Sequence, residues 1–215
     1  MSEIIAALFV ETDGCYFNLK NVDPWDIKRD ATKFNGNMPV IAHPPCTLWG
    51  PFAPINYKRW GGEKNKPGND GGLFDFALHS VERCGGVLEH PARSKAWLMY
   101  GIKKPLKAGW TRSRLGWVCE VWQSAYGHKA NKATRLYYCG KIEPFDLKWS
   151  KPIGTHQIGI SDQRGKAKNK KSLRYKKARE TPLEFRDTLI ELAIHSTGNF
   201  QKKIAQYQLE AFEQI

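Results

Sequence analysis

Short apolar runs that stop abruptly are the feature that most constrains this chain. Residues 4–10 (IIAALFV) and 39–43 (PVIAH) are such runs, and residues 87–89 begin a third. Runs of this length, bounded by turn residues, are typical of buried strands. Pro44 and Pro45 end the second run because proline cannot donate to a β-ladder.

Helical patterns lie between and after these runs. Residues 73–83 carry apolar side chains at helical spacing, and Gly85 and Gly86 follow as a stop signal. Residues 94–100 predict a short helix, and Thr181-Pro182 predicts the N-cap and first turn of another. With further strands near Val22 and at 117–122 and 134–139, the pattern favours an α/β fold with a largely parallel sheet.

Three stretches fall outside this alternation. Residues 47–72 are rich in Gly, Pro, Lys and Trp and predict a long functional or disordered loop. Residues 161–180 are basic and polar, and residues 201–212 predict a last amphipathic helix. We therefore expect a catalytic domain over 1–160 plus 181–197, a basic flexible segment at 161–180 and a C-terminal helix within 198–215.

A strong positive charge indicates a polyanionic partner. The formal net charge is +13, and residues 164–179 hold nine basic residues and no acid. Cations that neutralise phosphates release counterions, so this run favours DNA binding over the alternative of a solvated basic surface. The side chains expected to bind nucleic acid are Arg164, Lys166, Lys168, Lys170, Lys171, Arg174, Lys176 and Lys177.

The five cysteines are scattered, which argues against a structural zinc site and against a disulfide framework. We expect no metal. No apolar run is long enough to span a bilayer, and the first ten residues lack a basic leader. These features favour a cytoplasmic protein without a membrane partner, in the host cell cytoplasm if a phage encodes it, and leave the oligomeric state open.

Cys46 has the most unusual setting of the five. It follows an apolar strand and two prolines that stiffen the loop, which favours a nucleophile over a buried structural thiol. Glu89 also stands where a strand stops, and desolvation there is expected to protonate it so that it donates to a ring nitrogen. A cap or an ion pair is an equally good interpretation of Glu89 alone. Together the two residues suit attack on carbon 6 of a pyrimidine.

In chain order, these segments resemble a compact DNA cytosine carbon-5 methyltransferase of the phage type. The similar pieces are residues 7–14 (ALFVETDG), 22–24 (VDP), 43–46 (HPPC), 89–91 (EHP), 124–137 with its Tyr126-Gly127 pair, and Thr181-Pro182 with its helix. The resemblance covers most of residues 4–195. It implies a Rossmann-like methyltransferase sheet with helices on both faces.

The resemblance also implies roles for residues. Cys46 adds to carbon 6 of a flipped-out cytosine, Glu89 supports N3, and Lys132 and Arg135 lie near the base or its phosphates. Trp49, Phe52 or Trp60 of the long loop fills the gap left by the base. S-adenosyl-L-methionine is the implied cofactor, and the residues expected to bind it are Phe9, Glu11, Thr12, Asp13, Gly14, Asp23, Pro24, Trp25 and Pro44.

The sequence departs from the family pattern in ways that keep alternatives open. Residues 11–14 contain one glycine where the family is glycine-rich, and His90 replaces an asparagine. About 40 residues between 140 and 180 imply a reduced or absent target-recognition domain and low sequence specificity, for example in evading restriction. One alternative is a pyrimidine-modifying enzyme with another cofactor or a nucleotide substrate. Another is a non-catalytic nucleic-acid-binding relative that acts as an anti-restriction or anti-defence decoy.

Overall fold

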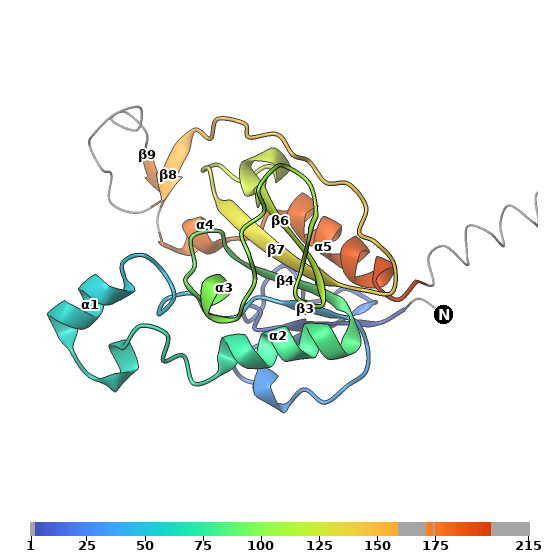
Figure 1. Ribbon diagram of the computed structural model, residues 1–215, viewed down its shortest axis with the longest axis horizontal. Helices are drawn as coiled ribbons and strands as arrows, with labels where there is room; N and C mark the ends of the chain where they lie inside the picture. Colours follow the sequence, from blue (N-terminus) through green and yellow to red (C-terminus); the bar gives the residue numbers. More distant parts are fainter. Residues whose placement is uncertain (1–2, 159–170, 174, 199–215) are drawn as a thin grey trace, which may run out of the picture.

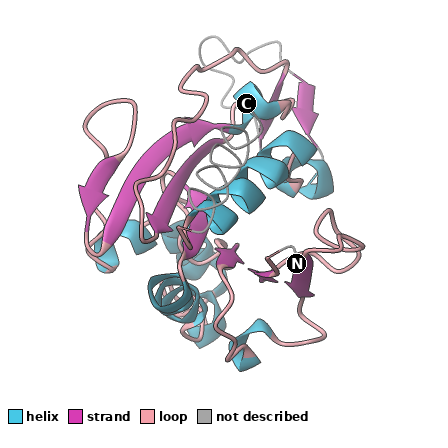
Figure 2. Ribbon diagram, turned by 90° about the vertical axis from the view of Figure 1, so that its right-hand side faces the viewer, coloured by secondary structure: helices cyan, strands magenta, loops and turns pink. Residues whose placement is uncertain are grey.

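The structure is a computed structural model that describes residues 3–158, 171–173 and 175–198. A seven-stranded sheet crosses its centre in the order β2-β1-β3-β4-β7-β6-β5 (Figures 1 and 2). The strands are β1 Ile5–Leu8, β2 Val22–Trp25, β3 Val40–Ala42, β4 Gly86–Pro91, β5 Thr111–Ser113, β6 Gly116–Trp122 and β7 Ala133–Cys139. Strands β2, β1, β3, β4 and β6 run one way, and β7 and β5 run the other way. The predicted α/β class is confirmed, with a sheet that is mixed at one side.

Five α-helices surround the sheet within the described ranges: α1 Ala53–Trp60, α2 Leu73–Cys84, α3 Ala96–Met99, α4 Tyr175–Arg179 and α5 Leu183–His195. Three 3₁₀ turns lie at Ala31–Lys33, Glu63–Asn65 and Gln123–Tyr126. Two further short strands, β8 His156–Ile158 and β9 Lys171–Leu173, pair in parallel as a separate small sheet. None of these helices is long and apolar enough to cross a bilayer.

The two faces of the sheet are covered by different helices, as expected. Side chains of a strand alternate between faces, so Leu8 and Ala42 belong to a core with α2, whereas Ala7 and Ile41 belong to a core with α5. Helix α2 contributes Phe74, Ala77, Leu78 and Val81, and α5 contributes Phe185, Leu189, Leu192 and Ala193, all of them buried. Burial on both faces explains the unbroken apolar runs of the sequence.

Gly86 shows why the chain has a glycine pair where α2 passes into β4. Its φ is +117°, and a Cβ there would lie 2.0 Å from the carbonyl oxygen of Val40 on β3. Only glycine adopts this backbone without strain and lets the two strands approach this closely. The stop signal predicted at Gly85 and Gly86 therefore also serves strand pairing.

Several predictions at the level of elements were wrong. The expected loop 47–72 contains α1 and a 3₁₀ turn. Helix α5 has Pro182 at its N-cap position without a side-chain cap bond, so Thr181 does not cap it. Strand β5 was not predicted, and the expected flexible segment 161–180 contains β9 and α4. The helix predicted at 201–212 lies outside the described residues.

No second globular unit stands between β7 and α5 in the part of the chain that the structure describes. That stretch contains an extended segment, the small β8–β9 sheet and α4. Within the described residues, this stretch adds no strand to the main sheet. It leaves the carboxyl ends of the parallel strands as the place where a ligand meets the main sheet.

We predict that Phe185→Ala lowers the free energy of unfolding by about 3–5 kcal/mol, because it empties a site in the core. Phe185 is fully buried, and its ring centroid lies 5.0 Å from that of Tyr126. Urea denaturation followed by circular dichroism measures the change. Leu183→Ala is the matched control, since Leu183 is on the same helix but is 61% exposed and should change stability little. Equal losses in the two variants would contradict the placement of α5.

Candidate functional site at the carboxyl ends of β3 and β4

The order in which successive strands are added to the sheet changes direction between β1 and β3. The chain goes from β1 to β2 on one side and then to β3 on the other, so the loops that leave β1 and β3 diverge at this point. In open α/β sheets such a switch point opens a crevice at the carboxyl edge where ligands bind. The backbone N–H of His43 donates to Leu8 at 3.0 Å, and Cys46 follows three residues later. Cys46 therefore stands beside the crevice.

Glu89 reaches the same edge from β4. Its side chain has only 10% of its surface exposed, and both oxygens are engaged. His43 Nδ1 lies 3.0 Å from Oε2, and Gln123 Nε2 donates to Oε1 at 3.2 Å. Gln123 also donates to Thr134 Oγ1 at 3.0 Å. The expected meeting of Glu89 with the His43–Cys46 loop is thus present, although His43 is the residue that contacts the carboxylate.

The other ring nitrogen of His43 contacts Tyr16. The Tyr16 hydroxyl lies 2.9 Å from His43 Nε2, and Tyr16 is 3% exposed. Tyr16, His43 and Glu89 therefore form one buried hydrogen-bonded chain. The sequence pattern assigned no role to His43 or Tyr16. The sequence did contain a signal for His43. It lies two residues after Ile41, and side chains two residues apart along a strand face the same side of the sheet.

Glu89 is ionised at neutral pH, contrary to the expectation that desolvation would protonate it. Burial acts to raise its pKa, but the hydrogen bond from His43 and the charge of Lys132 outweigh burial and bring the pKa to about 2. A carboxylate that accepts two hydrogen bonds in a buried site is strongly favoured over the neutral acid. In this state Glu89 accepts hydrogen bonds and donates none.

The Cys46 thiol is protonated at neutral pH. Burial raises its pKa above the usual value, and the negative charge of Glu89 raises it further. The positive charges of Arg179 and Lys132 act in the opposite direction. This mutual influence means that Cys46, Glu89 and two cations share one electrostatic environment. A thiol in such a site is a nucleophile once its proton has left.

The structure places the two predicted basic residues, Lys132 and Arg135, on different sides of the sheet or its edge. Lys132 lies at the site, because its charge acts on both Cys46 and Glu89, and its Nζ donates to the Arg179 carbonyl at 3.4 Å. Arg135 lies on the opposite face of the sheet, where it binds Glu120 at 2.6 Å and stacks over Trp97. The prediction for Arg135 was wrong because side chains alternate along β7.

His90 faces away from the site as well. It is directly opposite Arg135 in the β4–β7 pairing, and its ring packs edge-on against Phe74 and Trp97. Burial lowers its pKa to about 4, so the ring is neutral at pH 7. His90 is therefore packed in the core under α3, where it also interacts with the backbone of Pro45, the residue before Cys46.

Arg179 is a site residue that the sequence did not single out. It ends α4, whose Ala178 is buried against the body while Lys176 and Lys177 are exposed. The carbonyl of Arg179 accepts from Lys132, which places the end of the basic run beside Cys46. The signal was its position as the last of the nine basic residues in the run, next to Glu180.

The loops expected to bind S-adenosylmethionine bind each other instead. Thr12 Oγ1 donates to Asp26 at 2.6 Å, and the same carboxylate accepts from the amides of Lys28 and Arg29. These bonds lower the pKa of Asp26, the Thr12 bond most strongly. They join the loop after β1 to the turn after β2, so Asp26 is a structural residue that the sequence pattern missed.

Other residues predicted to bind the cofactor belong to the same contacts and turns within the protein. Asp23 pairs with Arg29 and accepts from the Trp25 indole at 2.9 Å, and Arg29 also stacks over the Trp25 ring at 3.8 Å. Gly14 closes a tight turn onto Glu11, and Phe9 and Asp13 have positive φ. The Asp23 carboxylate is thus engaged by protein partners, as is that of Asp26.

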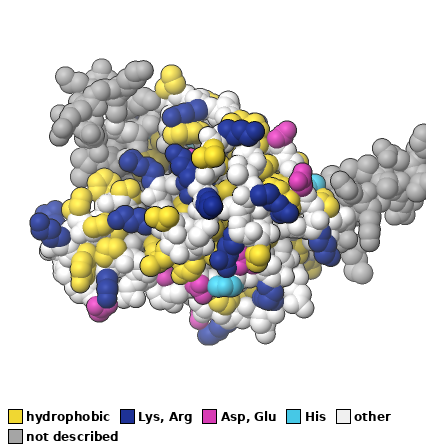
Figure 3. All heavy atoms as spheres, viewed as in Figure 1, with side chains coloured by type: hydrophobic (Ala, Val, Ile, Leu, Met, Phe, Trp, Pro, Cys, Tyr) yellow, Lys and Arg dark blue, Asp and Glu magenta, His cyan; other side chains and the backbone are white. Residues whose placement is uncertain are grey.

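The outer surface near the site is basic and partly aromatic. Of the predicted DNA-binding cations, Lys171, Lys176 and Lys177 are exposed, whereas Arg164, Lys166, Lys168, Lys170 and Arg174 lie outside the described residues. Lys and Arg side chains are spread over the face shown in Figure 3. On α1, which lies at the margin of the molecule in Figure 1, Trp60 is exposed, as is its N-cap residue Phe52. Trp49 is in the core, so it does not fill a gap left by a base.

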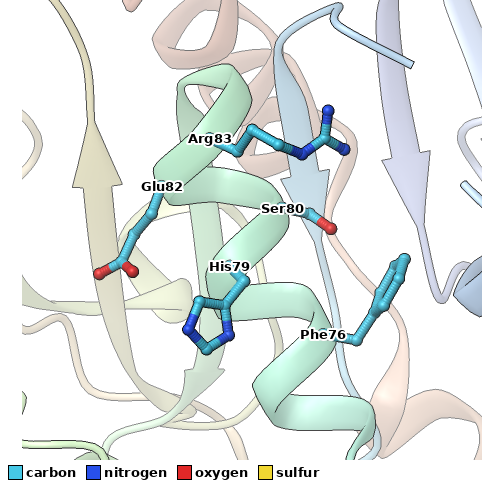
Figure 4. A pocket seen from close by; sticks show the side chains of 5 residues that line it. All are labelled: Phe76, His79, Ser80, Glu82 and Arg83. Carbon is cyan, nitrogen blue, oxygen red and sulfur yellow. The ribbon is translucent and has the colours of Figure 1, made fainter. Parts of the chain in front are cut away.

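Two hollows lie among the described residues, and the smaller one borders Cys46. The larger, of about 430 Å³, lies along the outer side of α2 and is lined by Phe76, His79, Ser80, Glu82 and Arg83 (Figure 4). Arg83 there donates to the carbonyl of Gly36, and Glu82 binds Arg114 and Tyr137, so these charges hold the fold together. The smaller, of about 260 Å³, includes Pro45 and Thr47 on either side of Cys46, with Lys64 and Asp70.

Within the described ranges, no group of three His, Cys, Asp or Glu residues is arranged to hold a metal ion. Comparison with known proteins gives no name to the site, because no family model, no curated protein and no solved structure matches the chain. Function is therefore inferred from the residues themselves.

We predict that Glu89 makes stability depend on pH in the acid range. A carboxyl group whose pKa falls from 4.5 to about 2 on folding stabilises the protein by about 3 kcal/mol above pH 4.5, and this is lost as pH falls toward 2. Glu89→Gln should therefore flatten the unfolding free energy over that interval in urea titrations. Glu184→Gln is the control, since Glu184 forms an exposed pair with Lys148. An unchanged slope in the Glu89 variant would show that its carboxylate is not selectively stabilised by folding.

Proposed function

We propose that this protein modifies pyrimidine bases in DNA, as a cytosine carbon-5 methyltransferase-like enzyme in which Cys46 adds to carbon 6. The observation that carries the proposal is the meeting of Cys46 and Glu89, from different strands, beside Lys132 and Arg179. A nucleophile, a carboxylate and two cations at a sheet's switch point suit an electrophilic ring attached to a phosphate backbone.

The α/β sheet supports the finer proposal of a Rossmann-like methyltransferase fold. Strands β2, β1, β3 and β4 are parallel and helices cover both faces, so all their carboxyl ends open at one edge. The segments that resemble the family's nucleophile loop and acidic tripeptide both belong to this edge. The chemistry is thus expected where the proposed fold binds its ligands.

The proposed step is a conjugate addition. Cys46 loses its proton, the Sγ–C6 bond forms, and the C5=C6 π bond breaks while N3 takes a proton. Carbon 5 then carries the electron density and reacts with an electrophile. The carbon-5 hydrogen then leaves as a proton, Sγ leaves as thiolate and N3 gives back its proton, which restores the ring. Carbon 6 is out of reach inside a base stack, so the nucleotide is flipped out or comes from a single strand. Lys132 and Arg179 supply positive charge for its phosphates.

S-adenosyl-L-methionine as the source of the methyl group belongs to the same proposal but has separate support, namely the resemblance of residues 7–14 and 22–24. The closed contacts of Asp23 and Asp26 favour a second candidate, a pyrimidine-modifying enzyme that uses another electrophile at carbon 5. Calorimetric titration with S-adenosylmethionine distinguishes the two. Both share the Cys46 adduct.

We predict that Cys46→Ser abolishes hydrogen exchange at carbon 5 of cytosine. Addition at carbon 6 makes carbon 5 basic, so in D₂O the wild-type protein should replace its hydrogen with deuterium, which nucleoside mass spectrometry detects. This readout needs no methyl donor. A serine hydroxyl is a much weaker nucleophile, so we expect at least a ~100-fold loss with DNA binding unchanged.

Cys84→Ser is the matched control, because Cys84 is also partly buried but donates to Gly36 at the opposite end of α2. It should retain full exchange. Exchange that persists in Cys46→Ser, or that is absent from the wild-type protein on both single-stranded and duplex DNA, would overturn the proposed function.

We also predict that Lys176→Gln with Lys177→Gln weakens DNA binding in a salt-dependent way. Both side chains are exposed on α4, next to the site. Each phosphate-binding charge removed should reduce the slope of log K against log salt by about 1, so the double variant should lose about 2. Fluorescence anisotropy at several salt concentrations measures it. Lys103→Gln with Lys104→Gln, two exposed lysines in the loop after α3, is the control of equal charge. The same slope of log K against log salt in wild type and both double variants would show that α4 is a solvated surface that does not bind phosphates.

A further inference from the structure

The hydrogen-bonded chain through His43 links four separate elements. Tyr16 comes from the loop after β1, His43 follows β3, Glu89 is in β4, and Gln123 begins the 3₁₀ turn after β6. The three contacts measure 2.9, 3.0 and 3.2 Å. An apolar side chain of similar size would fill the same space but would take these contacts away from the Tyr16 hydroxyl and from Glu89.

The partners fix where the proton on neutral His43 lies. A carboxylate only accepts hydrogen bonds, so the 3.0 Å contact with Glu89 needs a hydrogen on Nδ1. Nε2 is then the acceptor and the Tyr16 hydroxyl donates to it. Burial holds the pKa of Tyr16 well above its usual value, so that hydroxyl keeps its proton. When His43 takes a second proton, Nε2 becomes the donor and the Tyr16 oxygen the acceptor.

We propose that His43 is a positioning residue that orients Glu89 and supplies, through its carboxylate, the proton that N3 takes when Cys46 adds to carbon 6. This rests on the proposed function. As the Sγ–C6 bond forms and the C5=C6 bond breaks, imidazolium Nδ1 gives its proton to Glu89 and the carboxyl passes one to N3. The thiol proton leaves to water, so one proton is released and one is taken up.

This arrangement solves the difficulty created by an ionised Glu89. A carboxylate with a pKa of about 2 cannot itself bring a proton to the ring at neutral pH. An imidazole is the side chain that changes charge between about pH 5 and 8, and it contacts Glu89 directly. His43 therefore provides the proton while Glu89 provides the contact with the base.

The charged and titratable groups around the pair come from every neighbouring element. Those whose charges act on Tyr16, Glu89, Cys46 or His90 near the pair are Cys15 after β1, Cys46 after β3, Glu89 and His90 on β4, Asp70 before α2, Lys132 before β7, Arg179 on α4, and Arg186 and Asp187 on α5. Among the groups at this edge, His43 and Cys46 are expected to lose a proton during the step, while Glu89 takes one up and passes one on.

The proposal gives the reaction a distinctive pH profile. The rate depends on the product of thiolate Cys46 and protonated His43. Because burial raises the pKa of Cys46, thiolate increases throughout the neutral range. The rate should therefore rise about tenfold per pH unit as long as His43 holds its second proton, and level off once that proton has left.

The test compares wild type with His43→Asn by deuterium exchange at carbon 5 of a cytosine-containing single-stranded oligonucleotide. The asparagine amide keeps an N–H near the place of Nδ1 but has no proton to give up. We expect this variant to be at least ~10-fold slower near pH 6 and to keep rising with pH where wild type levels off. His79→Asn, on the exposed side of α2, should behave as wild type.

The outcomes separate the two proposals. If wild type exchanges and His43→Asn has the same rate and the same levelling, His43 is not the proton source, although the proposed function stands. If wild type does not exchange at all, both fall. Proton–nitrogen correlation spectra of the histidine rings provide an independent check at neutral pH. They should show a hydrogen on Nδ1 of His43 that loses its hydrogen-bonded shift in Glu89→Gln, and a hydrogen on Nε2 instead would overturn the proposal.

Discussion

The buried hydrogen bond between His43 and Glu89 is the interaction on which the reactive edge depends. It joins the end of β3 to β4 by side chains, where the backbone ladder between these strands has ended at Ala42 and Leu88. Burying a carboxylate is unfavourable unless it is paired and hydrogen-bonded, and His43 and Gln123 together meet that requirement. The ionised state of Glu89 depends on this contact together with the charge of Lys132, and the Glu89 charge adds to burial in raising the pKa of Cys46.

The position of the site was predictable from the sequence because the period of a strand is simple and parallel strands end together. Two apolar runs, each followed by reactive residues, sufficed to bring Cys46 and Glu89 to one edge. The same rule, applied with the correct register, excludes Arg135: it is opposite His90, whereas Glu89 is opposite Leu136. That register depends on pairing across the sheet, which spacing along a single strand does not reveal.

Other parts were not predictable, for reasons that differ. The contact of Tyr16 with His43 depends on the path of a loop with several positive φ values, which local sequence specifies poorly. The protonation of Glu89 was predicted wrongly because desolvation was considered without the partners that oppose it. Helix α1 was hidden in a stretch rich in Gly, Pro and Lys, and β5 is a three-residue edge strand, Thr111–Ser113, that no apolar run marks.

Pro44 and Pro45 are the only residues between the imidazole and the thiol. Proline restricts φ even in the unfolded chain, so this short bridge has little conformational freedom to lose when the protein folds. For the same reason, this bridge loses little conformational entropy when a ligand binds. Ordering of the receptor is one of the main free-energy costs of association. The side chains of His43 and Cys46 are thus carried on one stiff piece of backbone. A ligand is therefore expected to bind at this edge with little rearrangement of the backbone.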